Sequence, residues 1–137
     1  MLLFFRFYNL ENLDNLDNLY MGTYKELDVY KRSFKSAIAI YKFSLTLPKY
    51  LQYDVADDIR RAARSIPSNI AEGYGRDKSN ADKRNFLRTA LGSNDEVLFN
   101  LDFIFALGLM EQQRYNKAKT EYTIIGAELF NLIKTLK

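Results

Sequence analysis

The sequence predicts an all-α protein, an antiparallel up-down-up-down four-helix bundle. Its 137 residues suit a single domain, because two domains need about twice that length. Only 2 Pro and 6 Gly are present, too few for a turn-rich β-sandwich. Four segments after residue 24 place apolar residues at helical spacing, and short connections separate them.

Residues 1–23 are predicted to be a low-complexity N-terminal extension, loosely held and separate from the bundle domain at 24–137. The triplet of Asn, Leu and a polar residue repeats from Asn9 to Leu19. Leucines three residues apart spiral around a helix instead of lining one face. One hypothesis is that this stretch is translated from an early start codon, with Met21 as the natural first residue.

The first helix is predicted over Glu26–Leu47, and Pro48 ends it. The apolar stripe expected to face the core consists of Tyr30, Phe34, Ala37, Tyr41 and Leu45.

The second helix is predicted to start at Asp54, a suitable N-cap, and to end at Glu72 before Gly73. Pro67 lies inside the helical pattern, and we expect it to kink the helix. The core stripe consists of Ile59, Ala62, Ala63, Ile66 and Ile70.

The third helix, Asn80–Leu107, shows two apolar stripes where a helix packed on one side needs only one. The first stripe comprises Phe86, Ala90, Ser93, Val97, Leu101 and Ile104. The second comprises Leu87, Leu91, Leu98 and Phe105, and we interpret it as an oligomer interface. The alternative is a central helix buried on two sides within one subunit. Ser93 and Glu96 also resemble a capping box that starts a new helix, but the heptad pattern favours continuity.

The fourth helix, from about Glu111 to Lys137, follows a turn at Gly108. Its apolar residues alternate at spacings of three and four, as in a bundle seam. They are Tyr115, Ala118, Tyr122, Ile125, Leu129, Leu132 and Leu136.

The composition argues against an enzyme. The chain has no Cys and no His, so it lacks thiolates, the commonest general base and the commonest metal ligand. It has no P-loop and no Glu-x-x-His pair, and we expect no cofactor, no metal site and no catalytic residues. The most apolar run, Val97 to Met110, has 14 residues and contains Asn100 and Asp102, whereas a membrane span needs about 20. We therefore expect a cytoplasmic protein without a membrane partner.

Positive charge is concentrated in residues 60–88, which carry eight basic and three acidic residues. A helical wheel places Arg60, Arg61 and Arg64 opposite the core stripe, a geometry suited to phosphate. Asp57 shares this face and is expected to form a surface ion pair. The candidate nucleic-acid-binding residues are Arg60, Arg61, Arg64, Arg76, Lys78, Lys83, Arg84 and Arg88. The alternative is a face that only water contacts.

The stretch Ile59-Arg60-Arg61-Ala62-Ala63-Arg64-Ser65-Ile66-Pro67-Ser68-Asn69-Ile70-Ala71-Glu72-Gly73-Tyr74-Gly75-Arg76 resembles the hallmark of a known family. The same pattern continues at Phe86-Leu87 and Ala90-Leu91-Gly92-Ser93, and begins at Leu27-Asp28-Val29-Tyr30. The family comprises four-helix-bundle proteins encoded in intervening sequences of bacterial 23S rRNA genes. It is similar to the accessory protein of diversity-generating retroelements. The resemblance covers about residues 24–135.

This resemblance implies a bacterial homopentamer with a basic surface and a third helix that continues through Gly92-Ser93. It also implies association with rRNA or another nucleic acid, and for the retroelement relative a reverse transcriptase. Asp57 and Asp58 depart from the family pattern and lower the local positive potential. The motif residues to which we assign a mainly structural role are Ser65, Pro67, Asn69, Glu72, Gly73 and Gly75. Asn69 is expected to bond either the backbone freed by Pro67 or the loop at 73–76.

Two functions follow from the sequence. The first is a non-enzymatic oligomeric bundle that binds RNA or other nucleic acid through its basic face. The second is a protein–protein assembly module with no nucleic-acid ligand.

Overall fold

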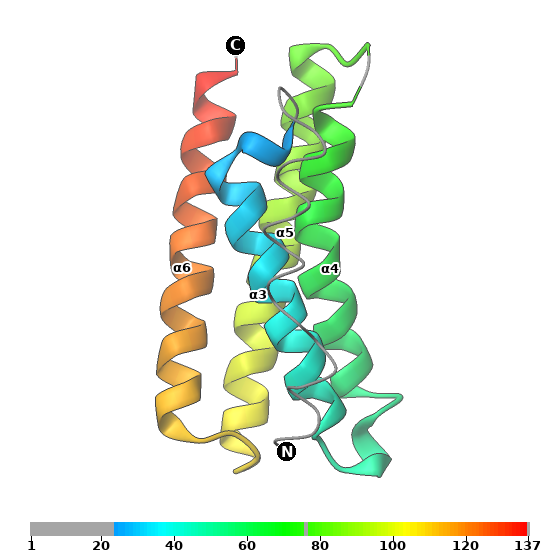
Figure 1. Ribbon diagram of the computed structural model, residues 1–137, viewed down its shortest axis with the longest axis vertical. Helices are drawn as coiled ribbons and strands as arrows, with labels where there is room; N and C mark the ends of the chain where they lie inside the picture. The colour runs from blue at the N-terminus through cyan, green and yellow to red at the C-terminus, as the bar shows by residue number, and fades with distance from the viewer. Residues whose placement is uncertain (1–23, 76, 137) are drawn as a thin grey trace.

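Four long helices lie side by side in an up-down-up-down bundle, as the sequence predicts (Figure 1). The computed structural model describes residues 24–75 and 77–136, and the described residues contain no β-strand. The long helices are α3 (Asp28–Leu45), α4 (Val55–Gly73), α5 (Asn80–Ala106) and α6 (Gln112–Thr135). Two short 3-10 helices, η1 (Tyr24–Glu26) and η2 (Lys49–Leu51), precede α3 and α4. The predicted extension at 1–23 lies outside the described residues.

The core-facing side of α3 differs from the prediction. Of the five stripe residues predicted from the sequence, only Ala37 is buried, while Tyr41 and Leu45 are exposed. The side chains of α3 that are buried are Val29, Ser33, Ala37, Ile40, Lys42 and Ser44. Small serines fit this face because their hydroxyls donate to carbonyls of their own helix, Ser33 to Tyr30 and Ser44 to Tyr41.

The core stripe of α4 is buried as predicted, with Ile59, Ile66 and Ile70 fully inaccessible to water. Asp54 occupies the N-cap position, although its side chain makes no capping hydrogen bond. The helix ends at Gly73, as expected, and it continues past Pro67 without interruption. Pro67 is itself buried, so its ring serves as an apolar packing group within the helix.

The third helix is continuous through Gly92 and Ser93, which confirms the preferred interpretation. It begins with a capping box that sequence analysis missed: the Ser79 hydroxyl accepts from the Asp82 N–H at 3.1 Å, and the Ser79 N–H donates to the Asp82 carboxylate at 3.3 Å. The signal, Ser-x-x-Asp before an apolar run, was present in the sequence. The predicted turn after this helix is also present, with Gly108 at φ 77°.

Helix α6 completes the core with Tyr122, Ile125 and Leu129, all predicted from its heptad pattern. Gly126 allows α6 to approach α5 closely, because a Cβ at this position would lie 2.9 Å from Asn94 Nδ2. That amide donates to the Tyr122 carbonyl at 2.9 Å. None of the helices in the described part of the chain has the length and apolar character needed to span a membrane.

Candidate nucleic-acid surface and assembly face

Arg60 is half-buried, and its guanidinium turns towards the end of α3 and the turn that follows, so the helical-wheel placement of this residue opposite the core is wrong. Its Nη1 donates to the Ser44 hydroxyl and to Gln52 Oε1, each at 3.0 Å, and its Nη2 donates to the Gln52 carbonyl at 2.7 Å. The Gln52 amide in turn donates to the Ser44 and Leu47 carbonyls. Arg60 therefore connects α4 to the end of α3 and to the turn after it, and its guanidinium is committed to this network.

Arg61 and Arg64 are exposed on the outer face of α4, as predicted. Arg61 Nε lies 3.3 Å from Asp57, which confirms the expected ion pair one helical turn away. Asp58 and Glu72 are also exposed on α4, so two arginines share the helix surface with three carboxylates. The outer surface of α4 is therefore close to neutral.

The remaining basic residues gather where α4 gives way to α5. Lys78 Nζ lies 4.9 Å from the centre of the Phe86 ring, and Lys83 Nζ lies 5.3 Å from the centre of the Tyr74 ring. Both are distances at which a cation is attracted to an aromatic ring. Arg84 Nη1 donates to the Leu136 carbonyl at 2.9 Å, which joins the start of α5 to the end of α6.

Arg88 is exposed one turn further along α5. Arg76 lies outside the described residues. We call Lys78, Lys83, Arg84 and Arg88 the loop-end cluster.

Close packing explains why the loop-end cluster forms at this point. A Cβ at Gly73 would lie 3.0 Å from the Phe86 Cβ, so glycine allows the end of α4 to touch the first turns of α5. The Gly75 N–H donates to the Glu72 carbonyl at 3.1 Å. The structural role predicted for Glu72 is therefore played by its backbone carbonyl, which accepts this hydrogen bond in the turn. Asp77 then takes φ 59°.

Ionisation in the loop-end region is shaped by local contacts. The hydrogen bonds from the Ser79 hydroxyl and backbone lower the pKa of the Asp82 carboxyl, and the nearby Lys78 charge acts in the same direction. Burial raises the pKa of the Tyr74 hydroxyl. Asp82 therefore stays ionised and balances part of the positive charge of the cluster.

The two stretches that carry the family resemblance meet at a polar contact between α4 and α5. Asn69 Nδ2 donates to the Ser65 carbonyl at 2.8 Å and to the Ser65 hydroxyl at 2.9 Å. The Ser93 hydroxyl donates to the same Ser65 hydroxyl at 2.8 Å. Asn69 thus bonds its own helix, and among the described residues it bonds neither the loop at 73–75 nor the Ala63 carbonyl, which Pro67 leaves without an N–H donor.

The proposed oligomer stripe on α5 is largely used within the chain. Leu87 is fully buried, and Leu91 and Leu98 are partly buried against the core. Phe105 stacks on Tyr115 of α6, with ring centres 4.2 Å apart. The prediction that Leu87 contacts another chain is wrong, because α5 is the central helix that packs against both α4 and α6. This is the alternative that the sequence left open.

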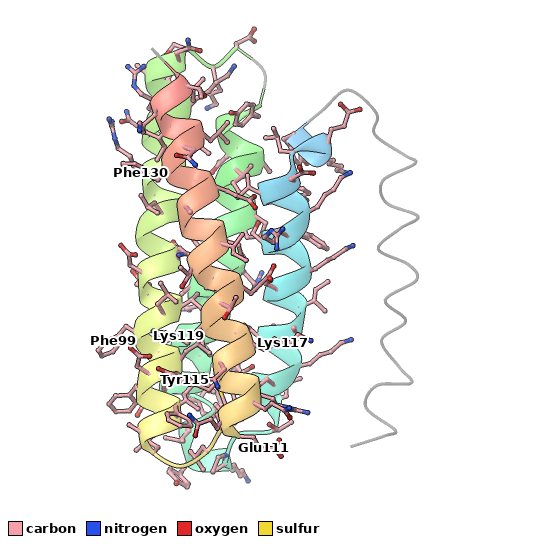
Figure 2. All side chains as sticks on the ribbon, turned by 90° about the vertical axis from the view of Figure 1, so that its left-hand side faces the viewer. Phe99, Glu111, Tyr115, Lys117, Lys119 and Phe130 are labelled. Carbon is pink, nitrogen blue, oxygen red and sulfur yellow. The ribbon has the colours of Figure 1, made fainter. Side chains whose placement is uncertain are left out.

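Different apolar side chains of α5 and α6 are exposed. Phe99 and Phe103 lie one turn apart on α5, with ring centres 6.2 Å apart, and are 65% and 47% exposed. Figure 2 shows Phe99 pointing outward from α5. Leu107, directly after α5, and Ile124 and Phe130 on α6 are also exposed. Large apolar side chains are exposed elsewhere too, at Tyr41, Leu45, Tyr50 and Tyr53. A neighbouring pair of exposed phenylalanines such as Phe99 and Phe103 is typical of a surface that contacts another protein.

The fold and its surfaces define a helical bundle with a cationic end and exposed aromatic side chains. Residues 25–131 match the 23S rRNA-intervening sequence protein family, and the chain belongs to that family. No curated protein matches the chain.

The fold is also similar to a solved structure described as a protein of unknown function from the S23 ribosomal protein family of Bacteroides thetaiotaomicron. The two share 27% sequence identity with a TM-score of 0.69, over 77% of this chain and 95% of the other.

Proposed function

We propose that this protein is a non-enzymatic, self-assembling bundle that binds RNA through the loop-end cluster. The observation that carries the proposal is the charge of the segment between α4 and α5. Residues 76–88 contain five basic residues (Arg76, Lys78, Lys83, Arg84 and Arg88) and two acidic ones (Asp77 and Asp82). Because α4 is nearly neutral on its outside, this end of the bundle is the stronger attractor for a phosphate backbone.

Membership of a family named for sequences that interrupt 23S rRNA genes supports RNA as the nucleic acid. In this proposal the protein acts in the bacterial cytoplasm as a homo-oligomer, with a pentamer as the expected state. Its partners are rRNA or another nucleic acid, and a reverse transcriptase if the gene lies in a retroelement. It uses no cofactor.

Filter binding with rRNA fragments at two salt concentrations tests the proposal. If three phosphates are contacted, a fourfold rise in salt weakens binding roughly 20- to 40-fold. Changing Lys83 and Arg88 to Glu removes binding, whereas changing Arg61 and Arg64 to Glu reduces it much less. Binding that is absent or independent of salt contradicts the proposal.

The second candidate, an assembly module without a nucleic-acid ligand, is favoured by the exposed aromatic residues Phe99, Phe103 and Phe130. It predicts an oligomer in solution that ignores RNA at any salt concentration. Light scattering after size exclusion, run with and without RNA, separates the two candidates.

A further inference from the structure

A groove between α3 and α6 is a feature of the bundle that the proposed function leaves unused. It encloses about 450 Å³, within the range of small-molecule sites. In Figure 2, Lys117 lies on the flank of α6 that faces α3. The floor of the groove is apolar and consists of Ala39, Ile40, Phe43, Met110, Ala118 and Tyr122.

The groove has a structural cause. Towards the start of α3, Arg32 bridges to α6: its Nη1 lies 3.0 Å from Glu121 and its Nε 3.1 Å from Glu128. These ion pairs hold the first turns of α3 against the middle and second half of α6. Further along, the facing residues are small, with Ala39 on α3 and Ala118 on α6, so no side chain fills the space between the helices.

The rim of the groove is strongly cationic. Lys35 from α3 and Arg114 and Lys117 from α6 are exposed at this rim, whereas Lys42 of α3 lines the groove as a buried residue. Glu121 is the one acidic residue among the lining residues, and its carboxylate already accepts a hydrogen bond from Arg32. Lys35, Arg114 and Lys117 form no ion pair with another described residue. The positive charge of these three side chains is therefore not balanced by an ion pair within the described part of the chain.

We propose that this groove binds a small amphipathic carboxylate, with a medium-chain fatty acid anion as the model ligand. The alkyl chain covers the apolar floor, and the carboxylate accepts hydrogen bonds from Arg114 and Lys117 at the rim. The charge of the rim selects against cationic amphiphiles, and the floor selects against anions with no apolar part. This site is separate from the loop-end cluster and does not depend on RNA binding.

Calorimetric titration of the intact protein with hexanoate, octanoate and decanoate tests the proposal. We expect saturable binding of one ligand per chain, with about fourfold tighter binding for each methylene buried. Decanol is expected to bind at least tenfold more weakly than decanoate, because a hydrogen bond to a charged group is lost. Equal affinity for the two, or no saturable binding of decanoate, overturns the proposal.

Variants locate the ligand. Lys117→Glu and Arg114→Glu change exposed residues, so the fold is retained, and each weakens decanoate binding about tenfold or more. Lys134→Glu makes the same kind of charge change near the far end of α6, outside the groove, and leaves the affinity unchanged. Equal effects of all three variants overturn the site. A lack of decanoate binding together with loss of the oligomer in Lys117→Glu assigns the groove to a second copy of the chain, which also overturns the proposal.

Discussion

The Ser93 hydroxyl donates a hydrogen bond to the Ser65 hydroxyl over 2.8 Å, across the interface of α4 and α5. The same Ser65 oxygen accepts a hydrogen bond from Asn69 Nδ2, so one hydroxyl links the two helices and orders the turn around Pro67. Ser93 is 8% exposed, and water has little access to replace a lost partner. A polar contact of this kind contributes more to helix register than a methyl group in the same place.

Replacing either serine with alanine is expected to lower the free energy of unfolding by about 1 kcal/mol, because each change removes the hydrogen bond between the two hydroxyls. The double variant loses less than the sum, with a coupling energy of roughly 0.5–1 kcal/mol. Urea denaturation of the wild type, both single variants and the double variant measures this coupling. Additive losses would show that the two hydroxyls do not interact.

Gly126 and Gly92 form a matched pair on neighbouring helices. A Cβ at Gly126 meets Asn94 Nδ2, which is buried and fixed by its bond to the Tyr122 carbonyl, whereas a Cβ at Gly92 meets nothing within 4 Å. Alanine is favoured over glycine in a helix by about 1 kcal/mol. Gly92→Ala is therefore expected to stabilise the protein, and Gly126→Ala to destabilise it by about 1–2 kcal/mol despite that gain. Thermal unfolding measures the melting temperatures of both variants. Equal melting temperatures would contradict this view of the α5–α6 contact.

Arg60 and Arg64 lie one turn apart on α4, and we expect their replacement by alanine to change the free energy of unfolding by very different amounts. Arg60→Ala leaves Ser44 and Gln52 without a donor, and we expect a loss of about 2–3 kcal/mol in the free energy of unfolding. Arg64→Ala is exposed and is expected to change stability by less than about 0.5 kcal/mol. Chemical denaturation decides, and a stable Arg60→Ala variant would show that the Gln52 network is dispensable.

Tyr122 carries a buried hydroxyl with no hydrogen-bond partner among the described residues. Tyr122→Phe removes an unsatisfied polar group and is expected to stabilise the protein by about 1 kcal/mol at neutral pH. Burial also raises the pKa of this hydroxyl. In the unfolded chain tyrosine ionises near pH 10, while the folded chain keeps the proton, so stability falls as pH rises above about 10.

The difference in the free energy of unfolding between Tyr122→Phe and the wild type is therefore expected to grow above pH 10, because the variant lacks this ionisation. Urea denaturation at pH 7 and at pH 11 measures the difference. An advantage that stays constant with pH would mean that the hydroxyl ionises equally well in the folded chain.

The sequence predicts the helices of this bundle better than the faces they bury. Heptad spacing predicts all of the α4 stripe and the centre of the α6 stripe correctly. Isoleucine and leucine side chains on one face of a helix are buried only when that face packs against the core. On α3 the prediction fails because aromatic residues carry the periodic signal, while the buried face combines Val29 and Ile40 with the small residues Ser33, Ala37 and Ser44. Their burial depends on how closely α4 approaches, and this distance is a tertiary property.

The candidate site follows the same logic. Clustering of basic residues along the chain predicts a cationic region, and the structure gathers those of residues 78–88 near the connection of α4 and α5. The commitment of Arg60 depends on Gln52 and Ser44, which lie on other elements, and a helical wheel of α4 alone contains no information about them. The loop at Asp77 and the contact of Gly73 with Phe86 likewise follow from packing between helices.

Assembly provides the last prediction, because buried and exposed apolar residues of α5 separate folding from association. Phe99→Ser and Phe103→Ser remove exposed aromatic surface and are expected to dissociate the oligomer while the helical content is retained. Leu87→Ser changes a fully buried residue and is expected to lower the free energy of unfolding by about 2–5 kcal/mol.

Light scattering after size exclusion gives the mass, and circular dichroism gives the helical content. A single 16.0 kDa species in the wild type would contradict assembly through this face. If Leu87→Ser dissociates the oligomer and Phe99→Ser does not, the interface lies at the stripe predicted from the sequence, which contains Leu87, and not at Phe99.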